Sequence, residues 1–312
     1  MSGADATGTV VLAGAGGFIG RDFRRRFEAG GWKVRTIGRT GGGGVGAVWG
    51  DTAGMAALLE GADLLVNLAG RSVSCRYTAR NRAEILDSRV STTAELGRAV
   101  AACATPPRDW FNASTGTIYR SAEGAGVPAG GFPEDDGGIG SGFSVDVARA
   151  WERTLAQAQT PSTRRIPLRI TIVLGPGGGV MRPFVNLARL GLGGRMGPGT
   201  QWFSWIHLED LYRAVLFLHR HGDITGPVNV ASPNAVGNAG LMAAVRSALK
   251  VPFGLPTPAW LLKMGAVLIR TETELVLKSR WVRPQKLIDA GFQWHHPDLD
   301  EALADILAVD RG

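Results

Sequence analysis

The residues with the clearest chemical meaning are three glycines, Gly14, Gly17 and Gly20, which follow an apolar run at 10–13. The run predicts a buried strand, and residues 21–29 predict a helix. The first glycine permits a tight turn, the second lets backbone approach a pyrophosphate, and the third lets the helix pack on the strand. The helix N-terminus adds free N–H groups and a positive dipole end. The segment therefore predicts a cradle for dinucleotide phosphates, with a simple glycine-rich turn as the alternative.

The end of the next predicted strand, 32–37, indicates which dinucleotide binds. Such a strand end faces the adenine ribose, where an NAD enzyme often carries an acidic residue. Here the chain has Arg39 and Thr40, without a carboxylate. Arginine can bind the 2′-phosphate of NADP bidentately and stack on the adenine. We therefore predict a preference for NADP(H); the alternative is an ordinary surface arginine.

Strands alternate with helices in the segments that must position these groups. Such alternation predicts an α/β fold, a doubly wound parallel sheet of the Rossmann type. Ligands of such sheets lie beyond the carboxyl ends of the strands, where Asp51, Ala69 and Gly70 stand as further cofactor-binding candidates. The remaining strands are predicted at 45–49, 63–68, 109–114 and 165–174, and the helices at 53–60, 78–104 and 145–158.

The organisation of the chain follows from this pattern. We predict an NADP-binding Rossmann domain over 1–175, with further elements of that domain in 200–232. Residues 176–312 begin with a glycine-rich stretch and are predicted to form mainly a small C-terminal substrate lobe.

Composition narrows the classes of partner. The net charge of +7 comes mostly from arginine and suits either an anionic ligand or a solvated basic surface. Without zinc-ligand spacing or a basic run interleaved with aromatic residues, neither a metal nor a nucleic acid is expected. Cys75 and Cys103 predict reduced thiols in a cytoplasmic protein. The apolar stretch 260–269 contains Lys263 and is too short to span a bilayer, so no membrane partner is expected.

Motifs spread over nearly the whole chain carry a further signal. In order they are GAGGFIG at 14–20, NLAG at 67–70, DSRV at 87–90, NASTG at 112–116, LGPGGG at 174–179, QWFSWIHLED at 201–210, GPVN at 226–229 and RPQKLIDAGF at 283–292. With them the chain resembles the extended short-chain dehydrogenase/reductase superfamily, in the "epimerase family" branch that has a C-terminal domain of unknown function. The resemblance implies an NADP-binding Rossmann domain with a small substrate lobe, and a possible homodimer. It adds Phe18, Ile19, Leu68 and Arg89 to the cofactor-binding candidates.

The chain departs from the superfamily at its catalytic pair. That chemistry normally rests on Tyr-x-x-x-Lys, in which the lysine lowers the pKa of a tyrosine that exchanges a proton with the substrate oxygen. None of Tyr77, Tyr119 and Tyr212 has a lysine four residues later. Ser144 and Ala148 take the places of the pair, so another group must supply the proton if the chain is an enzyme.

Hydroxyl groups near the expected nicotinamide remain as catalytic candidates. Thr115, with Ser114 beside it, falls at the superfamily's substrate-oxygen position and can donate a hydrogen bond to a carbonyl; the alternative is a strand-end hydroxyl that satisfies local backbone. Tyr119 is a candidate proton donor, or else a packed loop aromatic. His207 is expected to be structural rather than catalytic. Five aromatic residues can wall a substrate pocket, although core packing is favoured: Trp202, Phe203, Trp205, Trp260 and Trp281.

Three functional hypotheses follow, and they leave open whether the chain is an enzyme. The first is an NADP(H)-dependent oxidoreductase or epimerase-like enzyme acting on a small carbonyl, alcohol or sugar-nucleotide-like substrate. In it, Thr115 orients the substrate oxygen, and Tyr119, another acid or water supplies the proton. The second is an NADP(H)-binding sensor or partner-binding protein without redox turnover. The third is non-redox dehydration or cyclisation in the same pocket.

Overall fold

A seven-stranded sheet organises the molecule, and all of its strand pairs are parallel. The computed structural model describes residues 7–42, 44–122, 124–135, 138–258 and 278–309. The strand order is β10-β6-β5-β4-β1-β2-β3. In chain order these strands are β1 (Thr9–Ala13), β2 (Lys33–Gly38), β3 (Ala47–Val48), β4 (Leu64–Asn67), β5 (Asp109–Thr115), β6 (Arg164–Ile170) and β10 (Val228–Val230).

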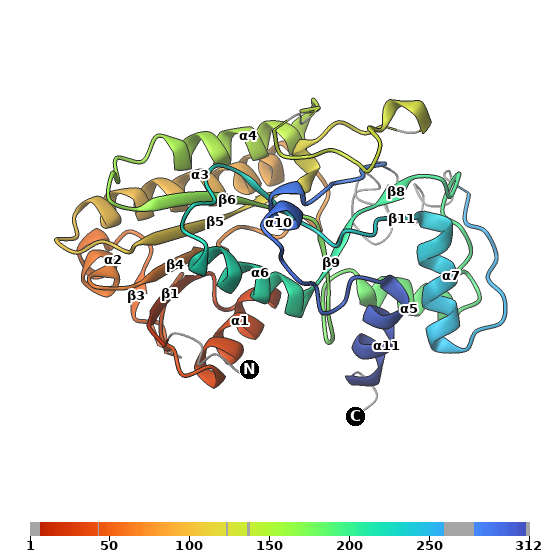
Figure 1. The fold of residues 1–312 in the computed structure, drawn as a ribbon, viewed down its shortest axis with the longest axis horizontal. Coiled ribbons are helices and arrows are strands. Elements are labelled where there is room, and N and C mark those ends of the chain that lie inside the picture. The colour runs from red at the N-terminus through yellow and green to blue at the C-terminus, as the bar shows by residue number, and fades with distance from the viewer. Residues whose placement is uncertain (1–6, 43, 123, 136–137, 259–277, 310–312) are drawn as a thin grey trace.

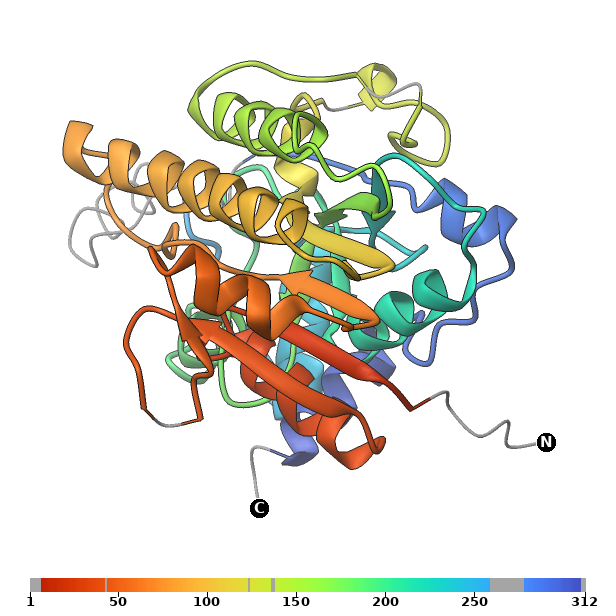
Figure 2. The same cartoon turned by 90° about the vertical axis from the view of Figure 1, so that its left-hand side faces the viewer.

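Helices cover both faces of this sheet, which confirms the predicted doubly wound α/β fold (Figures 1 and 2). One face carries α2 (Thr52–Leu59), α3 (Ala79–Ala101) and α4 (Phe143–Ala156). The other face carries α1 (Phe18–Ala29) and α6 (Leu208–Arg220).

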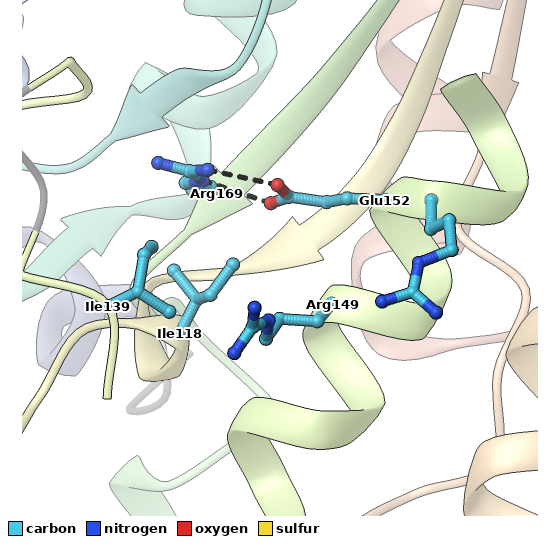
Figure 3. A pocket seen from close by; sticks show the side chains of 6 residues that line it. Ile118, Ile139, Arg149, Glu152 and Arg169 are labelled. Carbon is cyan, nitrogen blue, oxygen red and sulfur yellow. Dashed lines mark hydrogen bonds and ion pairs between the residues drawn. The ribbon is translucent and has the colours of Figure 1, made fainter. Parts of the chain in front are cut away.

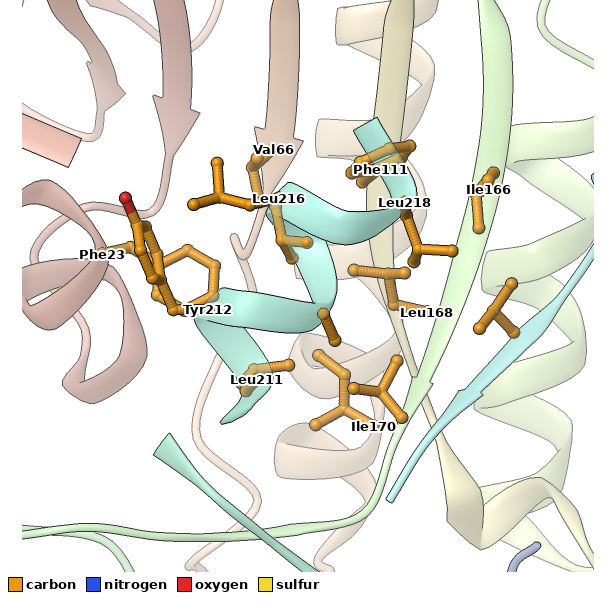
Figure 4. Close-up of a cluster of buried hydrophobic side chains, with 14 of the residues drawn as sticks. Phe23, Val66, Phe111, Ile166, Leu168, Ile170, Leu211, Tyr212, Leu216 and Leu218 are labelled. Atoms are coloured by element: carbon orange, nitrogen blue, oxygen red, sulfur yellow. The ribbon is translucent and has the colours of Figure 1, made fainter. Parts of the chain in front are cut away.

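The apolar character of the strands follows from this double cover. Val10 and Leu12 of β1 pack in the core under α1 and α6, whereas Val11 and Ala13 pack in the core under α2 and α3. A strand that is buried on both faces needs a continuous apolar run rather than an alternating one. Figure 4 shows the first of these cores, with Tyr212 of α6 packed beside α1.

Several predicted elements have other bounds in the structure; the helix predicted at 78–104 ends at Ala101, and the strand predicted at 45–49 is Ala47–Val48. The first helix begins at Phe18, three residues before the predicted start at residue 21. The single strand predicted at 165–174 is wrong at Thr171, where the chain leaves the sheet. Ile172 then donates its N–H to the carbonyl of Ser204 (3.3 Å), and the segment becomes β7 (Ile172–Leu174), paired with β9 (Trp205–His207). A pattern of apolar residues does not reveal a change of pairing partner.

The later part of the chain builds a second core beside the sheet. Buried side chains from the helices at 181–189, 238–249 and 299–309 pack in this core with Leu174 and Trp205. The three helices lie together at one end of the molecule (Figure 1). β10 returns to the main sheet. The predicted domain division, with its boundary at residue 175 and further Rossmann elements in 200–232, stays a prediction. The further elements are η1 (Gly116–Ile118), η2 (Gly124–Gly126), α5 (Met181–Arg189), β8 (Trp202–Phe203), β11 (Val236–Gly237), α7 (Asn238–Leu249), α10 (Gln285–Asp289) and α11 (Leu299–Val309).

None of the helices in the described ranges is long and apolar enough to cross a membrane. The apolar stretch at 260–269, which includes Trp260 and Lys263, lies outside the described residues.

Candidate functional site

The glycines after β1 are required by close backbone packing. Gly14 has a φ of +86° and donates its N–H to the carbonyl of Ile37 on β2 (3.2 Å). A Cβ at Gly14 would lie 2.8 Å from the backbone nitrogen of Ala69. A Cβ at Gly20 would lie 2.3 Å from the carbonyl oxygen of Gly14. The turn can therefore hold α1 against the strand only with glycine at these two positions.

Gly17 has a different surrounding. A Cβ at Gly17 would meet only the Gly14 oxygen, at 3.5 Å, and a Cβ at Gly16 would meet nothing within 4 Å. Gly17 is the N-cap of α1, and this helix start has no side-chain cap and no acidic residue in its first turn. The N–H groups of the first turn, including those of Phe18 and Ile19, are therefore left for an anion. The open space and the uncapped donors fit a dinucleotide pyrophosphate.

The side chains of Phe18 and Ile19 face the protein. The Phe18 ring lies against the 175–179 turn, because a Cβ at Gly178 would meet its Cδ2 at 2.6 Å. Ile19 packs against the core under α1. Both residues can therefore serve a cofactor through their backbone rather than through their side chains.

The end of β4 forms the second wall of the cradle. The N–H of Leu68 donates to the carbonyl of Ala13 (2.8 Å), which holds this segment beside the glycine turn. A Cβ at Gly70 would lie 3.2 Å from Cζ of Arg89. The Arg89 guanidinium donates to the carbonyls of Arg71 (3.1 Å) and Ile85 (3.0 Å), and burial lowers its pKa. Arg89 thus lies under the wall and supports it.

Arg39 and Thr40 follow β2 and are both exposed. Ile37 pairs with Ala13, so Arg39 stands two residues beyond the cradle. Its side chain has no ion pair within the described residues. Asp51 lies further along the same edge, where its Oδ1 accepts the N–H of Gly54 (2.8 Å) and caps α2. The cofactor roles of these residues stay predictions.

The predicted catalytic hydroxyls at the end of β5 have protein partners. Ser114 is buried, and its Oγ donates to Oε1 of Glu152 (2.7 Å). Oγ1 of Thr115 accepts the N–H of Thr117 (3.2 Å), so it satisfies local backbone, which is the alternative to a catalytic role. It also shares a hydrogen bond with Oγ1 of Thr117 (3.0 Å), in which either hydroxyl can be the donor. When Thr117 donates, the hydroxyl of Thr115 keeps its own proton for another acceptor. Thr115 therefore stays a candidate for orienting a substrate oxygen.

Tyr119 is fully buried. Its hydroxyl donates to Oδ1 of Asn229 (2.7 Å) and accepts from Nη1 of Arg169 (2.9 Å), and its ring stacks on Phe132. Burial raises the pKa of this phenol, against the opposing effect of Arg169. The alternative of a packed loop aromatic describes these surroundings, and the proton-donor role stays a prediction.

A buried polar network around Tyr119 was missed by reasoning from the sequence. Glu134 accepts the N–H groups of Asn229 (2.9 Å) and Gln285 (3.1 Å), and burial raises its pKa. Arg169 binds both carboxylate oxygens of Glu152, each at 2.9 Å (Figure 3). One signal was present, since Arg169 interrupts an apolar strand and a buried arginine needs a charged partner.

His207 caps α6, which agrees with the structural role expected for it. Its Nδ1 accepts the N–H of Glu209 (3.2 Å), and Nε2 lies 3.3 Å from Oδ2 of Asp305. Burial, together with the nearby His296, lowers the pKa of His207 to about 4. Although His207, His296 and Asp305 are close enough to share a metal ion, an accepting Nδ1 leaves the proton of the neutral ring on Nε2. That nitrogen then has no lone pair for a cation, and the prediction of no metal is still untested.

The described aromatic residues of the later half pack within the protein. Trp205 is fully buried in the second core, where Phe203 lies against Phe184. The ring centroids of Trp202 and Trp281 lie 4.4 Å apart. These contacts agree with the core packing that was favoured, whereas Trp260 lies outside the described residues.

Comparison with known proteins places this geometry in a family. The family model for the NAD dependent epimerase/dehydratase family matches residues 10–231, and a domain of unknown function, DUF1731, matches 257–306. Human epimerase family protein SDR39U1 is 31% identical over 96% of this chain and 99% of its own length. Epimerase family protein YfhF of Bacillus subtilis is 30% identical over 79% of this chain and 78% of its own length.

Solved structures agree with this relation. The crystal structure of human SDR39U1 (isoform 2) with NADPH has a TM-score of 0.86 and 29% identity, covering 96% of this chain and 99% of the human one. A UDP-N-acetylglucosamine 4-epimerase from Bacillus cereus shares the fold, with a TM-score of 0.77 at 16% identity, covering 98% of this chain and all of that one. The seven-stranded sheet, the glycine cradle and the family match over most of the chain lead to one conclusion: the chain belongs to the NAD dependent epimerase/dehydratase family, in its extended short-chain dehydrogenase/reductase branch with a C-terminal domain of unknown function.

Proposed function

We propose that this chain binds NADP(H) across the carboxyl end of its sheet. The observation that carries the proposal is the uncapped first turn of α1, which offers N–H groups beside the open space at Gly16 and Gly17. Arg39 stands beyond β2 without an ion pair among the described residues, and its guanidinium suits a 2′-phosphate. The NADPH in the crystal structure of the human relative supports the same choice of cofactor.

The proposed activity is that of an oxidoreductase or epimerase-like enzyme on a small carbonyl, alcohol or sugar-nucleotide-like substrate. When bound, the cofactor supplies or accepts a hydride. With Thr117 as the donor in the hydrogen bond between their two hydroxyls, the hydroxyl of Thr115 donates its own proton in a hydrogen bond to the substrate oxygen. Tyr119, another acid or water supplies the proton that completes reduction.

Quenching of tryptophan fluorescence by NADPH and NADH tests the cofactor assignment. Arg39→Ala is expected to weaken NADPH binding about tenfold or more, because it removes a charge-assisted contact, and to leave NADH binding unchanged. Arg98→Ala, on the exposed face of α3, removes the same charge away from the cradle and serves as the control. If Arg39→Ala and Arg98→Ala bind NADPH equally well, the assignment of Arg39 is wrong.

A second function has its own support, a cofactor sensor or partner-binding protein without redox turnover. Ser144 and Ala148 of α4 stand where the superfamily carries tyrosine and lysine, and Ala148 is fully buried. Tight NADPH binding without oxidation across a panel of carbonyl substrates would favour this function. Conversion of a substrate without net consumption of cofactor would favour an epimerase, or a dehydratase or cyclase; product analysis by mass spectrometry separates these.

The expected homodimer and cytoplasmic location belong to the same proposal. The free thiols of Cys75 and Cys103 suit a reducing compartment. Light scattering on the purified chain measures the oligomeric state directly: twice the chain mass is expected, and a single chain mass contradicts the homodimer.

A further inference from the structure

An open cavity of about 370 Å³ lies on the α4 face of the sheet, next to β6. It is built from α4, β6, η1 and the loop that carries Ile139, and it therefore uses other elements than the α1 cradle (Figure 3). Its lining residues are Ile118, Ile139, Arg149, Glu152, Arg153 and Arg169.

At the floor of this cavity, the negative charge of Glu152 is paired with the positive charge of Arg169. Both carboxylate oxygens of Glu152 accept from Arg169, through Nε and Nη2, and Oε1 also accepts the hydroxyl of Ser114. These three donors occupy the carboxylate of Glu152. Glu152 makes no ion pair with Arg149 or Arg153.

The wall formed by α4 carries two arginines that have no carboxylate partner within the described residues. Arg149 and Arg153 are one helical turn apart and exposed, and neither side chain has a hydrogen bond or ion pair within the described parts of the chain. Like charges at this spacing repel each other on a helix. The arginines of α1 show the contrast, since Arg24 pairs with Glu28 and Arg26 with Asp22. The cavity therefore carries two positive charges that have no partner among the described residues.

An apolar surface accompanies these charges. Ile118 is almost fully buried, whereas Ile139 is 39% exposed and is one of few exposed large apolar side chains in the described ranges. Both isoleucines line the cavity together with the arginines. A ligand that matches this surface has an anionic group and an apolar part.

We propose that this cavity binds a small organic anion. Its carboxylate or phosphoryl group is held by the guanidinium groups of Arg149 and Arg153, which bind such groups through paired N–H donors. Its apolar part lies against Ile118 and Ile139. The site is distinct from the cradle at the α1 N-terminus and does not depend on the proposed cofactor.

Isothermal titration calorimetry on the full chain tests this site with three probes: phenyl phosphate, inorganic phosphate and the neutral benzyl alcohol. Excess NADPH keeps phosphate probes out of the cradle, and a repeat without NADPH on Gly17→Ala checks that the binding is independent of it. Phenyl phosphate is expected to bind more tightly than inorganic phosphate, and benzyl alcohol is expected not to bind. Absence of phenyl phosphate binding in both settings overturns the proposal.

Paired variants locate the binding. Arg149→Gln with Arg153→Gln is expected to weaken phenyl phosphate at least tenfold, because charged hydrogen bonds are lost. The matched control, Arg98→Gln with Arg182→Gln, removes two exposed helical arginines elsewhere and is expected to bind like the parent chain. Ile139→Ala is expected to reduce only the advantage of phenyl phosphate over inorganic phosphate. Equal weakening by both double variants would mean general attraction to a basic surface and would overturn the proposal.

Discussion

The two ends of the central sheet are built on opposite principles. At the amino end, the buried carboxylate of Asp109 accepts from Arg164 (2.6 Å) and lies 2.6 Å from Nδ1 of His219, with Arg108 at 3.1 Å. At the carboxyl end, the first turn of α1 is uncapped and Arg39 is unpaired among the described residues. The same sheet thus has, at its amino end, a group of charges that the protein satisfies itself and, at its carboxyl end, a set of donors that the described residues leave for ligands.

Arg164 shows how the polar groups at the amino end find their partners inside the protein. Its guanidinium also donates to the carbonyls of Leu218 (2.7 Å) and His221 (2.6 Å), where α6 ends. A cation at a helix C-terminus satisfies carbonyls that lack intrahelical partners and interacts favourably with the helix dipole. The amino end is therefore expected to govern stability, and the carboxyl end to govern binding.

The largest expected effect separates these two roles. Asp109→Ala should lower the free energy of unfolding by about 3–5 kcal/mol, because it leaves the guanidinium of the largely buried Arg164 without its carboxylate partner. Asp51→Ala, at the carboxyl end, should cost only about 1 kcal/mol for a lost helix cap. Urea unfolding measures both, and NADPH affinity of folded Asp109→Ala should stay unchanged. Equal losses of unfolding free energy for Asp109→Ala and Asp51→Ala would contradict the view that the amino end governs stability and the carboxyl end governs binding.

Two glycines of the cradle sharpen the comparison within the carboxyl end. Gly20→Ala should destabilise the protein by about 1–3 kcal/mol, because its Cβ would lie 2.3 Å from a backbone oxygen. Gly17→Ala should change stability by less than about 0.5 kcal/mol, because its nearest contact is an ordinary 3.5 Å. Both should weaken NADPH binding in fluorescence titrations. Unchanged binding by Gly17→Ala would mean that no pyrophosphate approaches there.

Tyr119 follows the carboxyl end of β5, but its hydroxyl has hydrogen-bond partners inside the protein, as the charged groups of the amino end do. Tyr119→Phe should cost about 1–2 kcal/mol of stability, since Asn229 and Arg169 each lose a partner. NADPH affinity should not change. If Tyr119 is the proton donor, turnover should fall far more than this structural loss accounts for; comparable turnover in the variant would remove it from the mechanism.

Acid titration gives the smallest effect. Burial tends to raise the pKa of Asp109, but hydrogen bonds from His219 and Arg164 outweigh it and hold the pKa below its usual value. A lowered pKa stabilises the folded protein above the unfolded value of about 3.9, and this contribution is lost as pH falls through the folded pKa. The stability advantage over Asp109→Asn, measured by urea unfolding, should therefore shrink as the pH falls below about 4. A stability advantage over Asp109→Asn that is the same at every pH would contradict the lowered pKa of Asp109.

Much of the fold could be predicted because its signals are local. The apolar run at 10–13 and the glycines after it specify a strand, a turn and a helix within one short segment. The superfamily motifs are equally local, and the cofactor-binding residues that they indicate stay a prediction. Helix α1 nevertheless begins earlier than predicted, because Phe18 and Ile19 follow the glycine that caps the helix.

The polar network around Tyr119 could not be predicted, because its members come from distant segments. Glu134 lies in a loop, Arg169 on β6 and Asn229 on β10, and no sequence spacing relates them. The surroundings of Ser114 and Tyr119 depend on that network, Ser114 through Glu152 and Tyr119 through Arg169 and Asn229. The hydrogen bonds of these two hydroxyls became visible only in three dimensions.

The position of β10 has a consequence for synthesis on the ribosome. Within the described residues, the outer edge of β6 pairs with Val228–Val230 alone, and Asn229 in turn donates to the carbonyl of Arg283. A nascent chain that has emerged only to residue 175 therefore exposes the unpaired edge of β6, an aggregation hazard until later residues arrive. Co-translational folding of the nucleotide-binding half should consequently wait for the lobe that follows it.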